Sequence, residues 1–326
     1  MKHNIITIGG STEDIMFYTK EAVLVRNNKD ILRQQLLGFE FGAKIVGEKV
    51  FFTYGGGGSN TAVNFSKLGL KTGVITAIGD DDNGQRIIKN FKNNKVSAAN
   101  IQTIKKVPSG LSFIVNFSGT TEHVIFTYRS ANNQLLISEK SLSKAKADWF
   151  YLASLSGPKW PANLKNIFEH SAKKKIKIGW NPGASQLAKG YSSLKKYLQQ
   201  TEVLILNKDE AIELVLSSGY KTQNINQLLK YLKLMGPAVV AITQGAKGAA
   251  VCSGNQICSE KALPIQGINT TGAGDAFGSS LVAGLIIYKD LAKALKLAIH
   301  QSNYVIREIG AQKGLLSIAQ LKKNVE

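Results

Sequence analysis

Short apolar runs alternate with longer amphipathic stretches along most of the chain. Six apolar runs predict buried strands, at residues 4–10, 71–79, 148–154, 175–180, 202–207 and 238–245. Stretches with helical periodicity lie between them, including residues 85–94, 161–174, 209–218 and 224–235. This pattern indicates an α/β fold with a doubly wound, mainly parallel sheet that helices cover on both faces. Ligands bind such sheets beyond the carboxyl ends of the strands.

Two segments do not fit the alternation. Residues 11–54 are too long for one connection and contain β-like pieces, and residues 110–128 resemble a hairpin around residues 118–121. Two β insertions that the main sheet cannot accommodate predict a small sheet of their own, which would suit a lid. After residue 270 the pattern is helical throughout, with expected helices at 274–287 and 290–308 and a short one near 317–323. We therefore interpret residues 1–326 as a single domain with a lid.

The charge balance bears on the class of partner. Hydrophobic residues make up 44% of the chain and charged residues 19%, which is a globular composition. The net charge is +19, but 36 Lys stand against 5 Arg, and the only dense basic run is at residues 173–177. Nucleic-acid readers rely on Arg, whose planar guanidinium binds phosphates and guanine through paired hydrogen bonds. The charge is therefore interpreted as a lysine-coated surface without a specific nucleic-acid partner.

Compartment and membrane contact follow from two further observations. The amino terminus has too short an apolar run for a signal peptide, and no stretch approaches membrane-spanning length. Cys252 and Cys258 flank a predicted hairpin turn, which allows a cross-strand disulfide but favours reduced thiols in a cytosolic protein. We expect a cytoplasmic protein with no membrane partner.

Residues 269–275, "NTTGAGD", precede a predicted apolar helix. The peptide N–H groups of Gly272, Ala273, Gly274 and Asp275 would lie at the amino end of that helix, which attracts anions. An acid at this place suits a general base that takes a proton from a hydroxyl attacking a bound phosphoryl group. The alternative is an acid that only complements the helix dipole.

Residues 53–69 contain four consecutive glycines followed by a predicted helix. Ser59, Asn60 and Thr61 come directly after them, so exposed backbone and a side-chain amide are available to a polyhydroxy ligand. A flexible loop is the alternative. Asn60 stands where a dinucleotide-binding fingerprint starting at Gly55 needs its third glycine, and a Walker-type phosphate loop does not occur in the sequence.

Two predicted strand ends carry polar residues. Asn207 ends one strand, and Glu210 falls in the first turn of the next helix. At the carboxyl edge of the sheet this pair could meet a metal–nucleotide complex, or it could be an Asn–Glu capping box. Residues 242–248, which include Thr243 and Gly245, form another strand end that by itself indicates only a turn.

In order and spacing these features resemble the ribokinase-like carbohydrate kinases, the PfkB family, over essentially the whole chain. The stretches that carry the resemblance are residues 55–60, the Gly79, Asp81 and Gly84 element, and residues 207–210, 243–245, 269–275 and 310–315. The resemblance implies a ribokinase-like fold and a kinase that uses ATP and Mg²⁺ to phosphorylate a small sugar or sugar-like alcohol.

The resemblance also implies roles for individual residues. Asp275 would be the base, and Gly272, Ala273 and Gly274 would form the anion hole for the transferring phosphoryl group. The substrate would contact four residues, Asp14, Gly56, Gly57 and Asn60. The nucleotide would lie along another four, Asn207, Thr243, Gly245 and Asn303. Glu210 would organise Mg²⁺ through water.

Two departures from ribokinases proper limit what the resemblance implies. Asn269 replaces an acid that often helps to hold a monovalent cation, so potassium activation is not carried over. Gly57 replaces a Lys, so ribose is not the default substrate. A sugar phosphate is a further possibility, with Arg129 either as its anion partner or as a solvated residue at a strand end.

Two other functions stay open. A nucleoside kinase would need an apolar wall for a base, and the residues that could supply it or form lid core are Phe17, Tyr18, Phe39 and Phe41. A catalytically silent kinase-fold binding protein is disfavoured because Asp275, Asn207 and Glu210 are all present. Apolar residues of the lid segments favour a homodimer through the lid, or packing onto the sugar or the main domain: Phe17, Val23, Phe52, Phe113, Val115 and Ile125.

Overall fold

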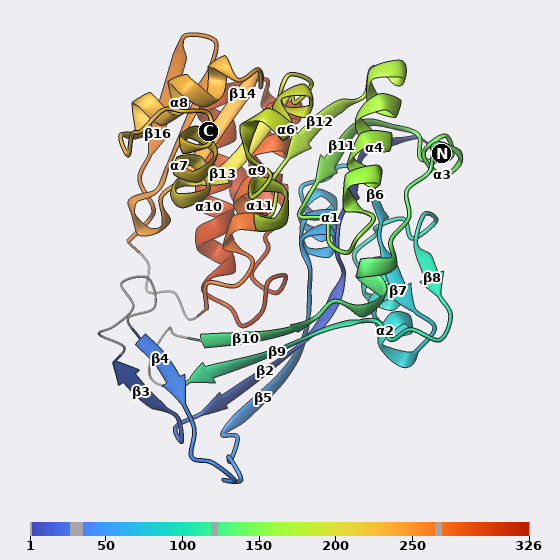
Figure 1. The fold of residues 1–326 in the computed structure, drawn as a ribbon, viewed down its shortest axis with the longest axis vertical. Coiled ribbons are helices and arrows are strands. Elements are labelled where there is room, and N and C mark those ends of the chain that lie inside the picture. Colours follow the sequence, from blue (N-terminus) through green and yellow to red (C-terminus); the bar gives the residue numbers. More distant parts are fainter. Residues whose placement is uncertain (1, 27–34, 119–122, 265–268, 326) are drawn as a thin grey trace.

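The computed structural model describes residues 2–26, 35–118, 123–264 and 269–325. Its main sheet has eight strands in the order β16-β15-β14-β13-β12-β11-β1-β6 (Figure 1). The six strands from β14 to β6 in this order run parallel, and β15 and β16 add an antiparallel hairpin at one edge. The predicted mainly parallel sheet is confirmed. The strands are β1 (His3–Ile8), β6 (Thr72–Ile75), β11 (Ala147–Leu152), β12 (Lys177–Trp180), β13 (Val203–Asn207), β14 (Val239–Thr243), β15 (Ala249–Ser253) and β16 (Gln256–Glu260).

Helices pack on both faces of the main sheet, as the alternation predicts. Neighbouring residues of one strand point to opposite faces, so Leu204 belongs to one hydrophobic cluster and Ile205 to the other. One cluster is completed by α4 (Trp160–Lys174), α6 (Gly190–Leu198), α7 (Lys208–Leu216) and α8 (Ile225–Leu234). The other is completed by α1 (Gly57–Lys67), α9 (Ala273–Tyr288), α10 (Leu291–Val305) and α11 (Ile318–Val325). Burial on both faces explains why these strands are continuous apolar runs.

A second sheet, which we call the small sheet, lies apart from the main sheet (Figure 1). Its strand order is β10-β9-β2-β5, with β9 and β2 parallel and the outer pairs antiparallel. Both segments that break the alternation contribute to it, and the turn near residue 120 lies outside the described residues. The strands are β2 (Thr12–Thr19), β5 (Lys49–Gly55), β9 (Gly110–Phe117) and β10 (His123–Tyr128). Between β2 and β5 in the sequence, β3 (Val23–Arg26) and β4 (Gln35–Gly38) pair antiparallel with each other.

The small sheet is anchored where β2 and β9 begin. Asn132 of the 3₁₀ helix η1 (Ser130–Gln134) accepts a hydrogen bond from the Ser11 amide at 3.0 Å and donates one to the Ser11 carbonyl at 2.9 Å. Asp81 caps α2 (Asp82–Asn93) and also accepts hydrogen bonds from the Ser109 amide and hydroxyl. The residues directly before β2 and β9, Ser11 and Ser109, are thereby hydrogen-bonded to the main domain.

The remaining elements refine the expectations. The predicted strand 71–79 is divided into β6 and β7 (Ala77–Gly79), and β7 pairs with β8 (Gln102–Ile104) instead of the main sheet. Short helices α3 (Glu139–Leu142) and α5 (Ala184–Leu187) complete the set that the structure describes. Among the described residues, no helix combines the length and hydropathy needed to cross a bilayer.

The predicted hairpin that contains the two cysteines is confirmed as β15 and β16. Cys252 lies opposite Ile257, and Cys258 lies opposite Val251. Side chains alternate along a strand, so the two thiols point to opposite faces of the hairpin. Both cysteines are free, and a disulfide between them is wrong.

Candidate active site

Two helices begin at glycines that the backbone requires. Gly56 caps α1 at φ +86°, and Gly272 caps α9 at φ +82°, a left-handed region that disfavours residues with a Cβ. A Cβ at Gly56 would lie 2.5 Å from the Gly10 carbonyl oxygen, and one at Gly272 would lie 2.4 Å from the Ala311 Cβ. Each glycine therefore lets the backbone turn and pack closely just before a helix begins.

A buried polar network fixes α1 to α9. The Asn64 side-chain amide donates to the hydroxyls of Ser279 and Ser280 at 2.7 and 2.8 Å. The Asn64 oxygen accepts from the Gln301 amide at 2.6 Å. All four side chains are fully buried. Because a buried polar group is costly unless it is bonded, this network holds the two helices in one relative position.

The glycine loop between β5 and α1 contacts two carboxylates. A Cβ at Gly55 would lie 1.9 Å from Oδ2 of Asp14, and a Cβ at Gly57 would lie 3.4 Å from Oδ1 of Asp275. The Asn60 amide donates to Oδ2 of Asp275 at 2.9 Å. The loop thus joins Asp14 from the small sheet to Asp275 from the main domain.

Burial raises the pKa of both acids. For Asp275, the hydrogen bond from Asn60 lowers the pKa and the negative charge of Asp14 raises it. For Asp14, hydrogen bonds from the Thr12 and Ser112 hydroxyls lower the pKa, while burial keeps it above its ordinary value. A carboxylate with a raised pKa is a better proton acceptor than a solvated one, which suits general-base chemistry.

A cavity of about 240 Å³ opens at the carboxyl ends of β12, β13 and β14, beside the amino end of α9. This is the edge of the sheet at which ligands are expected. The cavity brings together seven polar or glycine residues, Asn181, Asn207, Glu210, Thr243, Gly272, Gly274 and Asp275.

Asn207 and Glu210 form a capping box at the start of α7. The Asn207 Oδ1 accepts from the Glu210 amide at 2.9 Å, and the Glu210 Oε2 accepts from the Asn207 amide at 2.8 Å. This is the structural alternative that the sequence leaves open, and it fixes both side chains at the cavity wall. Burial raises the pKa of Glu210, and the charges of Glu213 and Asp209 raise it further.

The donor set fits Mg²⁺ only in part. Among the described residues, no group of three or more His, Cys, Asp or Glu side chains could enclose a metal ion. Mg²⁺ commonly keeps several waters and is held by one or two carboxylates together with substrate phosphates. Glu210 and the other cavity oxygens match this arrangement of one carboxylate, waters and substrate phosphates.

Three other predicted site residues, Ala273, Gly245 and Asn303, do not line this cavity. Ala273 is the first residue of α9, next to the glycines that line the wall. Gly245 begins the 3₁₀ helix η2 (Gly245–Lys247) at φ +57°, with open space where a Cβ would stand. Asn303 is buried in α10 and donates to the Ile299 carbonyl at 2.8 Å, so its amide is bonded within its own helix.

Gln312 is a site residue that the sequence did not reveal. Its amide donates to the Asn60 Oδ1 at 3.0 Å and to the Ser59 hydroxyl at 2.9 Å, and its oxygen accepts from Asn90 at 2.9 Å. Because Gln312 holds the Asn60 oxygen, the Asn60 NH₂ group faces Asp275. The only available signal was its place within residues 310–315. Asn181 was also missed, although a polar residue directly after a predicted strand could have indicated it.

The four residues of the expected aromatic wall do not share one face of the small sheet with Asp14. Side chains alternate along β2, so Tyr18 shares a face with Asp14, whereas Phe17 points to the other face and contacts Phe113 at a ring distance of 5.7 Å. Phe39 is 39% exposed and Phe41 is fully exposed. Arg129 is exposed at the end of β10, as its solvated interpretation expects.

Known proteins resemble the chain over most of its length. The model of the pfkB family carbohydrate kinases matches residues 30–318. An ATP-dependent 6-phosphofructokinase of Thermoanaerobacterium thermosaccharolyticum is 24% identical, covering 82% of this chain and 84% of the relative. Arabidopsis thaliana ribokinase complexed with ribose and ATP has a TM-score of 0.80 at 18% identity, covering 100% of this chain and 99% of that one. A Burkholderia thailandensis nucleoside kinase in complex with inosine has a TM-score of 0.77 at 16% identity, covering 99% and 97%.

Proposed function

Because the chain belongs to the pfkB family of carbohydrate kinases, we propose that it transfers the γ-phosphoryl group of ATP to a hydroxyl of a small sugar or sugar-like alcohol. The enzyme is a phosphotransferase with an alcohol group as acceptor. The observation that carries the proposal is the glycine loop that contacts Asp14 on one side and Asp275 on the other.

Asp275 acts as the general base in this proposal. It takes the proton of the substrate hydroxyl while the hydroxyl oxygen forms a bond to the γ-phosphorus, and the bond from that phosphorus to the bridging oxygen of ADP breaks. The peptide N–H groups of Gly272, Ala273 and Gly274 at the amino end of α9 stabilise the negative charge of the transferring group. Asn60 keeps the carboxylate oriented through its hydrogen bond at 2.9 Å.

Asp14 binds the substrate hydroxyls, together with the backbone at Gly56 and Gly57 and the amide of Asn60. A Cβ at Gly57 would lie 2.8 Å from the Ala153 Cβ, so this backbone has no room for a larger side chain such as Lys. That restriction favours a substrate other than ribose, recognised by backbone groups and carboxylates.

The nucleotide lies in the cavity at the ends of β12 to β14 in this proposal. Asn207, Thr243 and Gly245 lie along the nucleotide, and Asn303 supports this region from α10. Mg²⁺, when bound, neutralises charge on the phosphates. Glu210 would hold that ion through water, and a bound cation would lower the pKa of Glu210, which burial and the charges of Glu213 and Asp209 raise.

A nucleoside kinase is the second candidate. Tyr18 shares the face of Asp14 in the small sheet, where an aromatic ring could contact a base. The fold similarity to a nucleoside kinase in complex with inosine is consistent with this candidate, although it carries no information about substrate.

A panel of sugars, sugar phosphates and nucleosides with Mg-ATP, followed by ADP release, tests these candidates. We expect ADP to form when a small sugar or sugar-like alcohol is the acceptor, and we expect no ADP formation with the same acceptor in Asp275→Asn. Turnover of nucleosides alone would favour the second candidate. If no compound in the panel leads to ADP release while the protein still binds ATP, the result would favour a catalytically silent kinase-fold protein.

We also propose that the small sheet is a lid that pairs with the small sheet of a second subunit. The strand register places Asp14 on one face of the sheet and two rows of apolar side chains on the other. These rows are Phe52–Ile15–Phe113–Phe126 and Val50–Phe17–Val115–Val124. Phe52 is 69% exposed and Phe126 is 58% exposed, so these apolar side chains of the outer strands are largely uncovered by the described residues. An apolar patch of this kind on one face suits an isologous contact between two copies.

Analytical ultracentrifugation of Phe52→Ser/Phe126→Ser tests the lid contact. We expect the wild-type protein to sediment as a dimer and the double variant as a monomer. Ile257→Ser is the matched control, because Ile257 is 50% exposed on β16 of the main sheet. A monomeric wild-type protein would overturn the contact without affecting the proposed reaction.

A further inference from the structure

A second cavity, of about 360 Å³, lies at the amino ends of the parallel strands, whereas Asp275 lies beyond their carboxyl ends. It opens at the amino ends of β1, β11 and β12, which are neighbours in the sheet order. Its charged lining consists of Lys2, Lys146, Asp148, Lys174 and Lys175. We call it the basic cavity.

The lysines of the basic cavity come from equivalent places in the fold. Lys2 directly precedes β1, and Lys146 directly precedes β11. Lys174 ends α4, and Lys175 lies two residues before β12. Because these strands are parallel and adjacent, lysines that are far apart in the sequence meet at one edge of the sheet. The dense basic run at residues 173–177 is one part of this arrangement.

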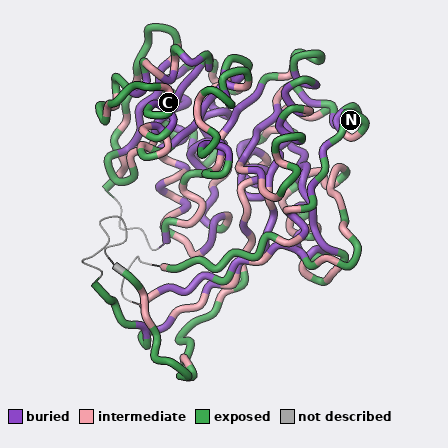
Figure 2. The backbone as a smooth tube through the Cα atoms, in the orientation of Figure 1, coloured by how far each residue is buried: buried purple, intermediate pink, exposed green. Residues whose placement is uncertain are grey.

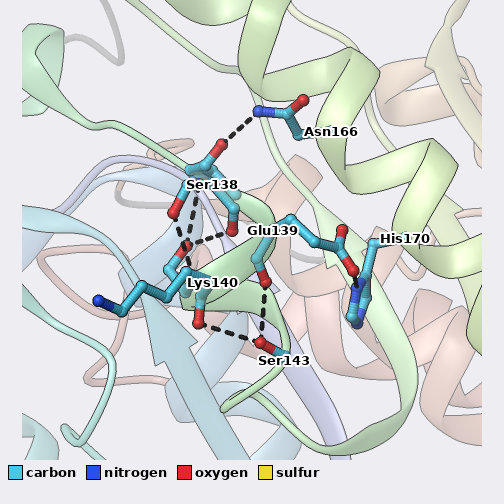
Figure 3. Close-up of polar contacts among 8 residues, drawn as sticks. Ser138, Glu139, Lys140, Ser143, Asn166 and His170 are labelled. Atoms are coloured by element: carbon cyan, nitrogen blue, oxygen red, sulfur yellow. Dashed lines mark hydrogen bonds and ion pairs between the residues drawn. The ribbon is translucent and has the colours of Figure 1, made fainter.

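One wall of the basic cavity is a fixed histidine. His170 is 2% exposed, and its Nδ1 contacts the Glu139 carboxylate at 2.9 Å (Figure 3). Its ring stacks on Phe150 at 6.3 Å with an interplanar angle of 19°. In the same close-up, Asn166 donates to the Ile137 carbonyl at 2.7 Å, which ties α4 to the segment before α3. The wall is therefore part of the packed core, while the lysines stand at the opening.

The charges around the basic cavity are not balanced. Lys2 pairs with Asp148 at 2.5 Å. Within the described ranges, no carboxylate lies within ion-pair distance of Lys146, Lys174 or Lys175. Glu139, at the far side of His170, is held by that histidine, and Lys174 contributes to lowering its pKa. Lys146, Lys174 and Lys175 thus line one cavity without a carboxylate at ion-pair distance.

We propose that the basic cavity binds a small molecule that carries a phosphate or diphosphate group. Lysine is a strongly hydrated point charge that suits a phosphate dianion, and three such groups at one opening attract a multivalent anion more than a monovalent one. The volume admits a phosphate group with a small organic part but not a folded chain. The basic cavity is separate from the cavity beside Asp275, because it opens at the amino ends of the parallel strands and the other opens at their carboxyl ends.

Isothermal titration with sodium pyrophosphate and with glucose 6-phosphate, at constant ionic strength in chloride, tests the proposal. The test variant is Lys146→Ala/Lys174→Ala. The control is Lys195→Ala/Lys230→Ala, which removes the same charge from exposed positions on α6 and α8. Each protein is also assayed for ADP release, so that the state of the active site is known.

We expect the wild-type and control proteins to bind at least one of the two ligands at a site that the test variant lacks or binds at least about tenfold more weakly. The KM for ATP should be equal in the three proteins. Equal affinity and stoichiometry in the test and control variants would overturn the proposal, because the lysines would then be an ordinary solvated surface. Absence of any binding by the wild-type protein that depends on Lys146 or Lys174 would overturn it equally.

Discussion

The main sheet and the small sheet consist of similar apolar strands but bury them very differently. In β13 and β14 every residue except the last is buried beneath helices, whereas in β10 all residues from Val124 to Tyr128 are exposed (Figure 2). The small sheet carries Asp14 on one face and exposed apolar side chains, such as Phe52 and Phe126, on the other. An element with few buried contacts opens at low free-energy cost, while a core sheet opens only with global unfolding. In the proposed function, the main sheet is therefore the rigid part that holds the reacting groups, and the small sheet is the part that moves over them.

The largest effect is expected at Asp275, which the main domain positions. Asp275→Asn keeps the shape of the side chain but cannot accept the proton, so turnover should fall by at least about 10²-fold. Nucleotide binding, measured by titration calorimetry, should survive. A variant with near wild-type turnover would remove Asp275 from the role of base.

A change where the two regions meet should affect substrate more than nucleotide. In Gly55→Ala the new Cβ would stand 1.9 Å from Oδ2 of Asp14, so the carboxylate must move. We expect the KM for the acceptor substrate to rise about tenfold or more and the KM for ATP to change little, since a small misplacement of a positioning group is costly. Gly38→Ala is the control, because its Cβ would meet only the Val23 and Val25 side chains at 3.3 Å or more, besides a carbonyl at 3.8 Å. Equal KM values in both variants would contradict the role of the loop.

Gln312 tests whether the main domain tunes the base as well as placing it. Gln312→Ala frees the Asn60 amide to rotate, which weakens the hydrogen bond that lowers the pKa of Asp275. We expect a loss of turnover of about three- to tenfold and an acid limb of the pH–rate profile displaced to higher pH. Gln312→Glu keeps an acceptor for Asn90 but presents no amide to Asn60, so it should not restore the profile. An unchanged acid limb with reduced turnover would assign Gln312 a purely structural role.

The sign of the pH dependence follows from burial. The folded-state pKa of Asp275 is raised, so activity should increase as pH rises through that value, because only the ionised form accepts a proton. The contribution of Asp275 to stability has the opposite trend. It is fully present below the unfolded-state pKa and is lost as pH rises through the raised folded-state pKa. Thermal unfolding of wild type and Asp275→Asn across this range measures the difference, which should shrink towards low pH.

The smallest effect is expected for potassium. Asn269 stands where ribokinases proper carry an acid that often helps to hold a monovalent cation, and its Oδ1 already accepts from the Thr271 amide at 2.8 Å. Its amide also lies 3.5 Å from the Asn116 oxygen of β9, so this residue links the main domain to the small sheet. Activity should change little when K⁺ is exchanged for a bulky organic cation at constant ionic strength. A large stimulation by K⁺ would show that backbone carbonyls suffice to hold the ion.

Elements that a short stretch of sequence specifies by itself could be predicted. Continuous apolar runs such as residues 202–207 indicate strands buried on both faces, and the turn residues before Asp275 indicate a helix amino end. Helix α6 (Gly190–Leu198) was not predicted, although its buried Leu194 and Leu198 stand at helical spacing, because it begins with a glycine, a residue of low helix propensity. The order and spacing of the glycine-rich elements supported the resemblance to the PfkB family, which is confirmed.

The support of the site could not be predicted because it depends on contacts between distant residues. Gln312 and Asn60 are 252 positions apart, and Asn132 and Ser11 are 121 apart. Nothing in the neighbourhood of Gln312 or Asn132 distinguishes a positioning amide from a solvated one. The two unlike faces of the small sheet are another case, because they follow from the pairing of β2 with both β5 and β9.

Hydrogen exchange with and without acceptor substrate plus a nonhydrolysable ATP analogue tests whether the small sheet is a lid. Amides of the small sheet, in β2, β5, β9 and β10, should gain protection when both ligands bind, because the sheet closes over the substrate and excludes water. Amides of α10 and of β13 and β14 should change little. Equal protection of the small sheet in both states, in a protein that sediments as a monomer, would show that this sheet is ordinary core and not a lid.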